Sequence, residues 1–363
     1  MLNWFSQVFA VIRFSILSLP QRKGSSAAAL LGIAGVVAVM VGVLSIAQGV
    51  MKTMKSSSGD TNAIVLRSGA DSEMTSGLGG DDVRLIAEAP GIARNESGVL
   101  ASPELFVIIN LPMRSTGTDA NVPMRGVQSS AMGVREGFRL IEGRMFEWGL
   151  NEVIVGKGAK AQFAGLEIGS SVPVGQEQWP VVGVFESGGG LAESEIWVDA
   201  AVLQPAYRRG NSFQAVYVTL NNRDAFDEFK DTLTSDPRLN VKPMRQSEYY
   251  DAQSSTIYNL ITGLGTTIAI IMGLGAIFGA LNTMYTAVSA RTREIATLRA
   301  LGFKAFPVVV SVVTESLLLA FLGGLIGAGL AWLAFDGYQA ATLNWASFSA
   351  ITFAFDVNFK LLS

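Results

Sequence analysis

The chain has 363 residues, of which 49% are hydrophobic and only 16% are charged, and its mean hydropathy is +0.37. Soluble domains carry roughly 25% charged residues, so this composition favours a membrane protein. The net charge of −3 is small, and no basic patch indicates a nucleic-acid partner. The chain contains neither cysteine nor histidine, which excludes disulfides, thiolate nucleophiles, histidine bases and the usual zinc ligand sets.

The first 26 residues predict an amphipathic helix on the cytoplasmic face of a membrane. Apolar residues between Trp4 and Leu19 recur at helical spacing on one face, while Asn3, Gln7 and Arg13 lie on the other. This pattern, next to an apolar span, is typical of a helix that lies in the membrane interface. Packing of the helix against a soluble partner is the alternative interpretation.

Three segments are apolar and long enough to cross a bilayer, which requires about 20 residues. We predict the spans at residues 27–48, 259–288 and 305–335; the first two carry no charge, and the third carries only Glu315. The first segment could also be a signal peptide cleaved after Ala47. Its apolar run, however, exceeds the usual length of about 7–15 residues.

Basic residues next to the spans predict their orientation. Arg13, Arg22 and Lys23 precede the first span. Arg291, Arg293, Arg299 and Lys304 lie between the second and the third. Both regions should be cytoplasmic, because short cytoplasmic loops are enriched in lysine and arginine. Residues 49–258 and 336–363 are then expected outside.

Residues 49–258 predict a folded α+β domain of one or two lobes. Short alternating or β-branched runs between turn residues predict strands at 63–67, 105–110, 152–156, 171–174, 179–185, 195–198 and 215–220. Residues 82–89 and 223–233 are more helical, and Phe226, Phe229 and Leu233 line one face of the second helix. The Ser/Gly-rich residues 56–60 and 69–80 predict mobile loops.

The sequence offers no catalytic or nucleotide-binding motif. It lacks G-x-x-x-x-G-K-[ST], and the glycine clusters 77–80 and 188–190 have no lysine that could reach a phosphate. Without histidine, a serine nucleophile would need another base, and no spacing indicates one. The acidic side chains Asp81, Asp82, Glu193 and Glu195 are expected on a solvated face. We therefore expect a non-catalytic chain that binds neither cofactor nor metal.

The charged stretch at residues 290–303 predicts a short cytoplasmic helix between two spans. Ile295, Leu298 and Leu301 give it an apolar stripe, and Gly302 can end it. Such a helix could transmit force from a soluble partner into the membrane. An ordinary basic loop that only follows charge topology is the alternative, and the pattern alone favours neither.

The same stretch resembles the R-x-x-E-I-x-x-L-R-A-L-G signature of the FtsX/MacB/LolC family of ABC permeases. The matching residues are Arg291, Glu294, Ile295, Leu298, Arg299, Ala300, Leu301 and Gly302. Glu315, followed by Gly323, Gly324, Gly327 and Gly329, is similar to the third span of that family. Residues 142–144 with 151–155, and 165–170 with 179–185, resemble passages of the MacB-type periplasmic domain.

The resemblance implies a MacB-like (type VII) permease subunit in a bacterial inner membrane. The N-terminus would be cytoplasmic, residues 49–258 periplasmic, and ATP and Mg would bind in separate ATPase subunits. Those subunits would dock on the cytoplasmic coupling helix at 289–304, through Arg291, Arg293, Glu294, Ile295, Leu298, Arg299, Leu301 and Gly302. ATP-driven closure would then move the periplasmic domain, which is the mechanotransmission mechanism, for export or release of an envelope substrate.

Further partners are implied by the same resemblance. They are a second permease copy or a related permease, membrane lipids and, for a MacB-type system, a periplasmic adaptor and an outer-membrane channel. The family has a fourth span, whereas residues 336–363 contain none, so we expect a periplasmic loop leading to a missing span. The alternatives are an FtsX-like regulator of cell-wall hydrolases and a membrane sensor or scaffold that needs no ATPase.

Small residues in the spans predict close helix packing. Gly275-x-x-x-Gly279 in the second span and Gly323-x-x-x-Gly327 in the third allow two backbones to approach. Glu315 within the third span is expected to face protein or water, because an ionisable group is costly in lipid. A structural hydrogen bond between helices is the favoured role for Glu315, and a coupling role is the alternative.

Overall fold

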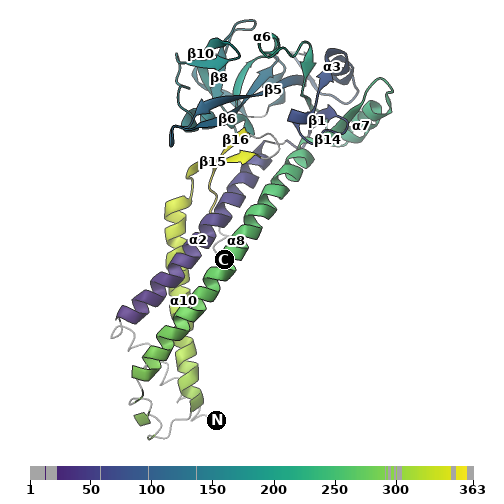
Figure 1. Ribbon diagram of the computed structural model, residues 1–363. Coiled ribbons are helices and arrows are strands. Elements are labelled where there is room, and N and C mark those ends of the chain that lie inside the picture. Colours follow the sequence, from purple (N-terminus) through teal and green to yellow (C-terminus); the bar gives the residue numbers. More distant parts are fainter. Residues whose placement is uncertain are drawn as a thin grey trace. The chain divides into compact units, whose positions relative to one another are not determined.

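The computed structural model describes residues 23–57, 59–96, 98–135, 137–290, 305–344 and 349–357, with the single residues 13, 292, 296, 297 and 300 (Figure 1). The chain divides into two compact units. The helical unit comprises residues 1–48, 259–338 and 355–363, and the sheet unit comprises residues 49–258 and 339–354. Most of the predicted amphipathic helix at 1–26 and of the coupling helix at 289–304 lies outside the described residues.

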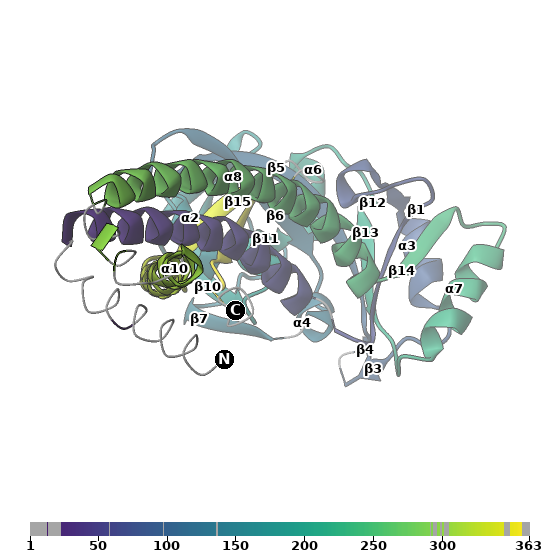
Figure 2. The ribbon, with the colours of Figure 1, turned by 90° about the horizontal axis from the view of Figure 1, so that it is seen from below.

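Three long helices contain the predicted spans: α2 (Lys23–Ser56), α8 (Gln246–Ala290) and α10 (Ala305–Phe335). Within the described residues, three segments are long and apolar enough to cross a membrane, at Ser26–Ser56, Gln246–Gly275 and Ser316–Phe335. The prediction of three spans is therefore confirmed by helix length and composition. In the view of Figure 2, α10 is seen almost end-on beside α2.

The sheet unit is built on a ten-stranded mixed sheet with the order β14-β1-β13-β5-β6-β11-β8-β10-β7, and β9 pairs with β10. Its strands are β1 (Asn62–Arg67), β5 (Ala101–Pro112), β6 (Asp119–Val127), β7 (Phe138–Gly143), β8 (Val153–Gly156), β9 (Ser171–Val174), β10 (Glu177–Ser187), β11 (Ile196–Asp199), β13 (Ala215–Thr219) and β14 (Val241–Arg245). Two neighbouring pairs, β6–β11 and β8–β10, are parallel, and the others are antiparallel.

Among the residues described in this unit there are also three two-stranded sheets and seven short helices. The small sheets are β2 (Leu78–Gly79) with β12 (Ser212–Phe213), β3 (Arg94–Asn95) with β4 (Gly98–Val99), and β15 (Gln339–Asn344) with β16 (Ser349–Ala354). The helices are η2 (Glu73–Thr75), α3 (Gly80–Ala87), α4 (Ala131–Val134), α5 (Lys157–Gln162), η3 (Leu191–Ser194), α6 (Ala200–Ala206) and α7 (Ala225–Ser235). The α+β architecture predicted for this segment is confirmed.

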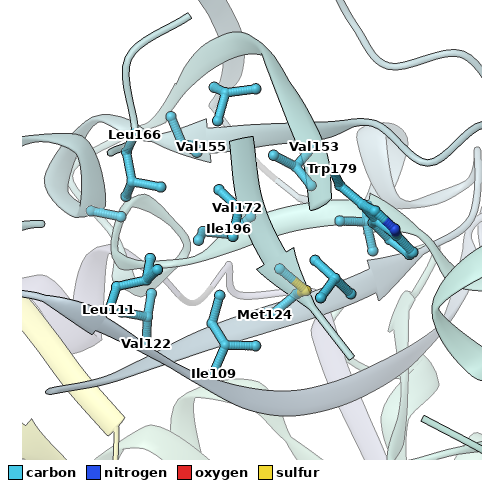
Figure 3. Close-up of a cluster of buried hydrophobic side chains, with 14 of the residues drawn as sticks. Ile109, Leu111, Val122, Met124, Val153, Val155, Leu166, Val172, Trp179 and Ile196 are labelled. Carbon is cyan, nitrogen blue, oxygen red and sulfur yellow. The ribbon is translucent and has the colours of Figure 1, made fainter. Parts of the chain in front are cut away.

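The largest core lies on one face of β5, β6, β8 and β11. Side chains alternate between the two faces of a strand, so Leu105, Val107, Ile109 and Leu111 of β5 all enter this core. Figure 3 shows Ile109 and Leu111 of this strand together with labelled residues of β6, β8 and β11 and the indole of Trp179. The intervening residues of β5 and β6 are therefore directed to the opposite face.

A second core lies under β1 and β13 and is covered by α3 and α7. It contains Phe226, Phe229 and Leu233 of α7, the three residues that were predicted to line one face of this helix. The sheet is thus continuous, and the main core and the core under β1 and β13 correspond to two lobes on it; a smaller cluster around Phe185 and Trp197 lies on β10 and β11.

Several elements differ from the sequence-based prediction. Residues 69–80 are not a mobile loop, because they contain η2 and β2 and bury Ala70 and Leu78. The strands β6, β7 and β14 were not predicted. The expected exterior loop at 336–363 contains the antiparallel β15–β16 hairpin, in which Ala340 faces Phe353.

Candidate functional site

Five charged side chains meet inside the sheet unit, on the face opposite the main core. Glu104 of β5 and Arg125 of β6 lie on neighbouring strands, where Phe106 pairs with Arg125. Glu195 directly precedes β11, whose Ile196 pairs with Met124. With Glu73 of η2 and Arg135 after α4, these residues make the ionic cluster. All five are buried, with exposed fractions between 0% for Glu104 and 8% for Glu73 and Arg135.

Arg125 is the centre of the ionic cluster. Its Nε and Nη2 donate to the two carboxylate oxygens of Glu195 at 2.8 and 2.7 Å. Nη1 donates to Glu73 at 2.7 Å and to Glu104 at 2.9 Å, and Nη2 also donates to Glu73 at 3.2 Å. These five bonds match the five N–H donors of a guanidinium group, so Arg125 is fully satisfied.

Arg135 adds the second positive charge. It is bound to both carboxylate oxygens of Glu104, which also accepts from Ser102 Oγ at 3.1 Å. The guanidinium carbon of Arg135 lies 3.8 Å from the ring centre of Tyr217, which favours a cation–π contact. Arg125 lies 5.6 Å from the same ring. The Tyr217 hydroxyl has no hydrogen-bond partner among the described residues, although it is buried.

The electrostatic balance of the ionic cluster favours the ionised forms of Glu195, Arg125 and Arg135. Burial by itself raises the pKa of Glu195, but the attraction of Arg125 outweighs it, and the pKa lies below its usual value. Burial lowers the pKa of Arg125, yet the three glutamates raise it well above normal. Two positive and three negative groups leave one negative charge in excess. Such a set is stable only while complete, because removing one partner leaves a buried charge uncompensated.

The ionic cluster is joined to the beginning of α8. The backbone N–H of Glu73 donates to the hydroxyl of Tyr249 at 3.3 Å, and Tyr249 and Tyr250 are both buried. A cavity of about 40 Å³ lies between the cluster, these tyrosines and Ile351 of β16. Drug-sized ligands occupy pockets of about 300–1,000 Å³, so this cavity has room for water only.

The chemistry of the ionic cluster is that of a structural link. Each of the three carboxylates is bound to a guanidinium group, which suits the joining of elements rather than proton transfer. Across the part of the chain that the structure describes, no group of three or more acidic, histidine or cysteine side chains is arranged to hold a metal ion.

The ionic cluster was not predicted from the sequence. Glu195 was expected on a solvated face, but it is only 5% exposed. Its burial was not predicted, because its partner Arg125 lies 70 residues away in sequence. One signal was present: Glu104 is the only charge in β5, and Arg125 is the only charge in β6 after Asp119. A single charge within an apolar strand can indicate a buried pair.

The residues predicted to couple to an ATPase cannot be placed. Arg291, Arg293, Glu294, Ile295, Leu298, Arg299, Leu301 and Gly302 lie outside the described residues. Glu315 lies within α10, but its side chain is also outside the described set.

Glycines on α10 face α2 within the helical unit. A methyl group built on Gly323 would lie 3.0 Å from Ile33 Cβ, and one on Gly327 would overlap the Ala34 carbonyl oxygen. The space around Gly275 of α8 is open, and the surroundings of Gly279 lie outside the described residues. On α8 it is Gly265, not Gly275, that approaches α2, where a methyl group would lie 2.7 Å from Val43 Cγ1.

Three apolar helices with a mixed α+β domain between the first two define a membrane protein with a large domain inserted between its first two spans. Two family models match the chain: the MacB-like periplasmic core domain over residues 26–236 and the FtsX-like permease C-terminal domain over residues 266–363. The chain therefore belongs to the MacB/FtsX family of ABC permeases, and its sheet unit is the MacB-like periplasmic domain.

Individual relatives are distant. The macrolide export ATP-binding/permease protein MacB of Rhodopseudomonas palustris is 22% identical over 360 residues, which cover 91% of this chain and 53% of that protein. The MacB protein of Azoarcus sp. is 28% identical over 349 residues, which cover 90% of this chain and 52% of that protein. The chain thus spans about half the length of the curated relatives it matches.

Two solved structures are also similar. The periplasmic region of MacB from Actinobacillus actinomycetemcomitans has 15% identity and a TM-score of 0.40, and the match covers 58% of this chain and 98% of that one. The extracellular domain of the ABC-type transporter YknZ from Gram-positive bacteria has 17% identity and a TM-score of 0.38, and the match covers 50% and 99%.

Proposed function

We propose that this chain is the non-catalytic permease subunit of a mechanotransmission ABC transporter. Separate ATPase subunits hydrolyse ATP in the cytoplasm, and the resulting movement of the membrane helices repositions the periplasmic sheet unit. The observation that carries this proposal is the continuity of α2 and α8. Each is one unbroken helix with one part in the helical unit and the other in the sheet unit.

The lengths of these helices support the transfer of force. At 1.5 Å per residue, the 34 residues of α2 extend about 50 Å and the 45 residues of α8 about 68 Å. The hydrocarbon core is only about 30 Å thick, so both helices are long enough to continue beyond it. Residues 49–56 and 246–258 belong to the sheet unit, and a displacement of the span can reach it along the helix.

The proposed source of energy is ATP hydrolysis by an ABC ATPase. The 363 residues contain no phosphate-binding loop of the G-x-x-x-x-G-K-[ST] type, and the matching relatives are named as combined ATP-binding and permease proteins. We propose that the ABC ATPase that drives this permease is a partner subunit. It docks on residues 291–302, where Arg291 and Arg299 supply the charges and Ile295, Leu298 and Leu301 the apolar face.

The substrate is handled on the periplasmic side. The described parts of the three spans are apolar and offer little polar lining for a pore. Export or release of an envelope substrate, carried out by two permease copies, fits this arrangement. The relatives are named for macrolide export, and a periplasmic adaptor with an outer-membrane channel would complete such a system.

The docking role is tested by charge reversal. In the double variant Arg291→Glu/Arg299→Glu, we expect the ABC ATPase to be lost from the purified complex while the permease stays inserted and folded. The matched control is Arg208→Glu/Arg209→Glu, the same change in charge on two exposed residues of the sheet unit. Mass spectrometry of the co-purified proteins gives the readout. Equal recovery of the ATPase with both variants would refute the docking role.

A further inference from the structure

Residues 187–197 of the sheet unit contact two of the three parts of this unit that are continuous with the membrane helices, and they are linked to the third through the ionic cluster. The segment comprises the end of β10, a turn of three glycines, η3, Glu195 and the first two residues of β11. The three parts are the C-terminal end of α2, the N-terminal end of α8 and the β15–β16 hairpin that follows α10. All belong to the sheet unit.

The first contact is with the end of α2. The backbone N–H of Leu191 donates to Ser57 Oγ at 2.7 Å, and Ser56 Oγ donates to the Gly189 carbonyl at 3.2 Å. Gly190 allows this approach, because a methyl group built on it would lie 2.8 Å from Ser57 Oγ. The φ of Gly190 is −84°, which any residue can adopt. The lack of a side chain at this position is therefore required by the contact and not by the backbone.

The second contact is with β16. Ser194 Oγ and Thr352 Oγ1 lie 2.5 Å apart, and the backbone N–H of Thr352 donates to Ser194 Oγ at 2.8 Å. Ser194 is only 3% exposed. Figure 1 shows the hairpin beside β6, consistent with the contacts of β16 with β6 and η3. Two hydrogen bonds through one buried hydroxyl therefore tie the hairpin to the segment.

The third contact reaches α8 through the ionic cluster. Glu195 is held by two hydrogen bonds from Arg125, Arg125 holds Glu73, and the Glu73 N–H donates to Tyr249 of α8. A direct link also joins two of the helix ends, since Gln246 Nε2 donates to the Ser57 carbonyl at 2.9 Å. The start of α8 is thus connected to the segment through the ionic cluster, and to the end of α2 through the side-chain amide of Gln246.

The segment is built to be stiff. One carboxylate oxygen of Glu193 accepts from the backbone N–H groups of Ser187 and Gly189, at 2.9 and 2.8 Å, and so closes the glycine turn. Gly188 and Gly189 have φ values of +58° and +74°, which glycine adopts without strain. The turn is closed by hydrogen bonds, and the whole segment begins in β10 and ends in β11. We therefore expect it to transmit a displacement as a rigid body.

We propose that the 187–197 segment is the junction through which displacements of the three membrane helices are passed to the sheet of the periplasmic domain. This rests on the mechanotransmission function proposed above. Ser194 and Gly190 act as positioning residues: the first holds the hairpin, and the second allows the end of α2 to seat on the glycine turn. The sheet unit would then respond to the combined position of the spans rather than to any one of them.

The test uses the full-length permease in proteoliposomes with its co-purified ABC ATPase. Hydrogen–deuterium exchange is measured with and without ATP, in peptides from the ends of α2 and α8 and in peptides from β6 and β8. In the unmodified protein, ATP should change exchange in both groups of peptides. In Ser194→Ala/Thr352→Ala and in Gly190→Val, the change at the helix ends should remain. The change should be lost in β8, which pairs with the strands at both ends of the segment, and reduced in β6, which β16 and Glu73 also contact directly.

Two further variants keep the result interpretable. Gly77→Val is the matched control, because a side chain there meets open space, and it should behave like the unmodified protein. Since the chain has no cysteine, Ser194→Cys/Thr352→Cys provides a tether that can be opened by reduction. The oxidised pair should restore the ATP-dependent change in β6 and β8, which a variant that had merely unfolded could not do.

The outcomes separate this inference from the function on which it rests. If β8 still responds to ATP in both the alanine pair and Gly190→Val, the junction is refuted while mechanotransmission stands. If ATP changes exchange at neither the helix ends nor the sheet of the unmodified protein, mechanotransmission itself is refuted, and the junction with it. Loss of the response in the two variants, with rescue by the oxidised pair, supports both.

Discussion

Replacing Arg125 by methionine should severely destabilise the periplasmic domain. The Arg125 side chain is 3% exposed and binds three glutamates that are themselves nearly inaccessible. Methionine is similar in length and apolar, so packing is largely kept while the charge is lost. Removing one partner of a buried ion pair costs about 3–5 kcal/mol, because the remaining charges are left uncompensated. In a domain of this size, that corresponds to a fall in Tm of about 6–20 °C.

Thermal unfolding of the full-length protein in detergent, followed by tryptophan fluorescence, measures this effect. Trp197 reports on the ionic cluster directly, because its Nε1 donates to Glu195 at 2.7 Å. The control is Arg139→Met, whose side chain is 74% exposed in its ion pair with Glu186. Exposed pairs contribute about 0–1 kcal/mol, so the Tm of the control should fall by only a few degrees.

The pH dependence gives a second and independent check. In the unmodified protein the pKa of Glu195 is lowered, so its contribution to stability is complete above its unfolded pKa of about 4.3 and is lost as the pH falls below that value. Without Arg125, burial raises the pKa of Glu195. Stability is then retained at low pH and lost as the pH rises through the raised value, so the deficit of the variant should be larger at pH 8 than at pH 5.

Two results would refute this reasoning. The first is a fall in Tm for Arg125→Met no larger than that for Arg139→Met, which would mean that the buried charges find solvent or other partners. The second is a deficit that shrinks as the pH rises, which has the wrong sign for uncompensated carboxylates.

Two further predictions concern packing, and each has a simple readout in the same melting assay. Tyr217→Phe removes a buried hydroxyl that has no partner among the described residues and keeps the ring beneath Arg135. The free energy of unfolding should therefore stay unchanged or rise by about 1 kcal/mol. A clear loss of stability would indicate that the hydroxyl is bound to water. Gly327→Val places a side chain against Ala34 and Val37 of α2 and should cost about 1–3 kcal/mol through overpacking. Gly329→Val, on the same helix with open space around it, is its control; equal losses would exclude α2–α10 packing as the cause.

The sequence alone determined the membrane organisation and the family. A span needs a continuous apolar run of about 20 residues, and this requirement is local, so residues 27–48, 259–288 and 305–335 could be recognised without their neighbours. The same is true of strands such as β1 and β13, whose residues are β-branched and lie between turns. The signature at residues 291–302 is also contiguous, which is why it identified the family before any contact was known.

Only the tertiary structure decided which polar residues are buried and what they join. Glu73, Glu104, Arg125 and Glu195 come from separate elements, and the sequence does not show that they meet. Their burial depends on partners up to 70 residues away, and it is favourable only when all are present. The role of Ser194 was hidden for the same reason, because its partner Thr352 lies 158 residues away in sequence. The packing of the hairpin at residues 339–354 on η3 is non-local in the same way.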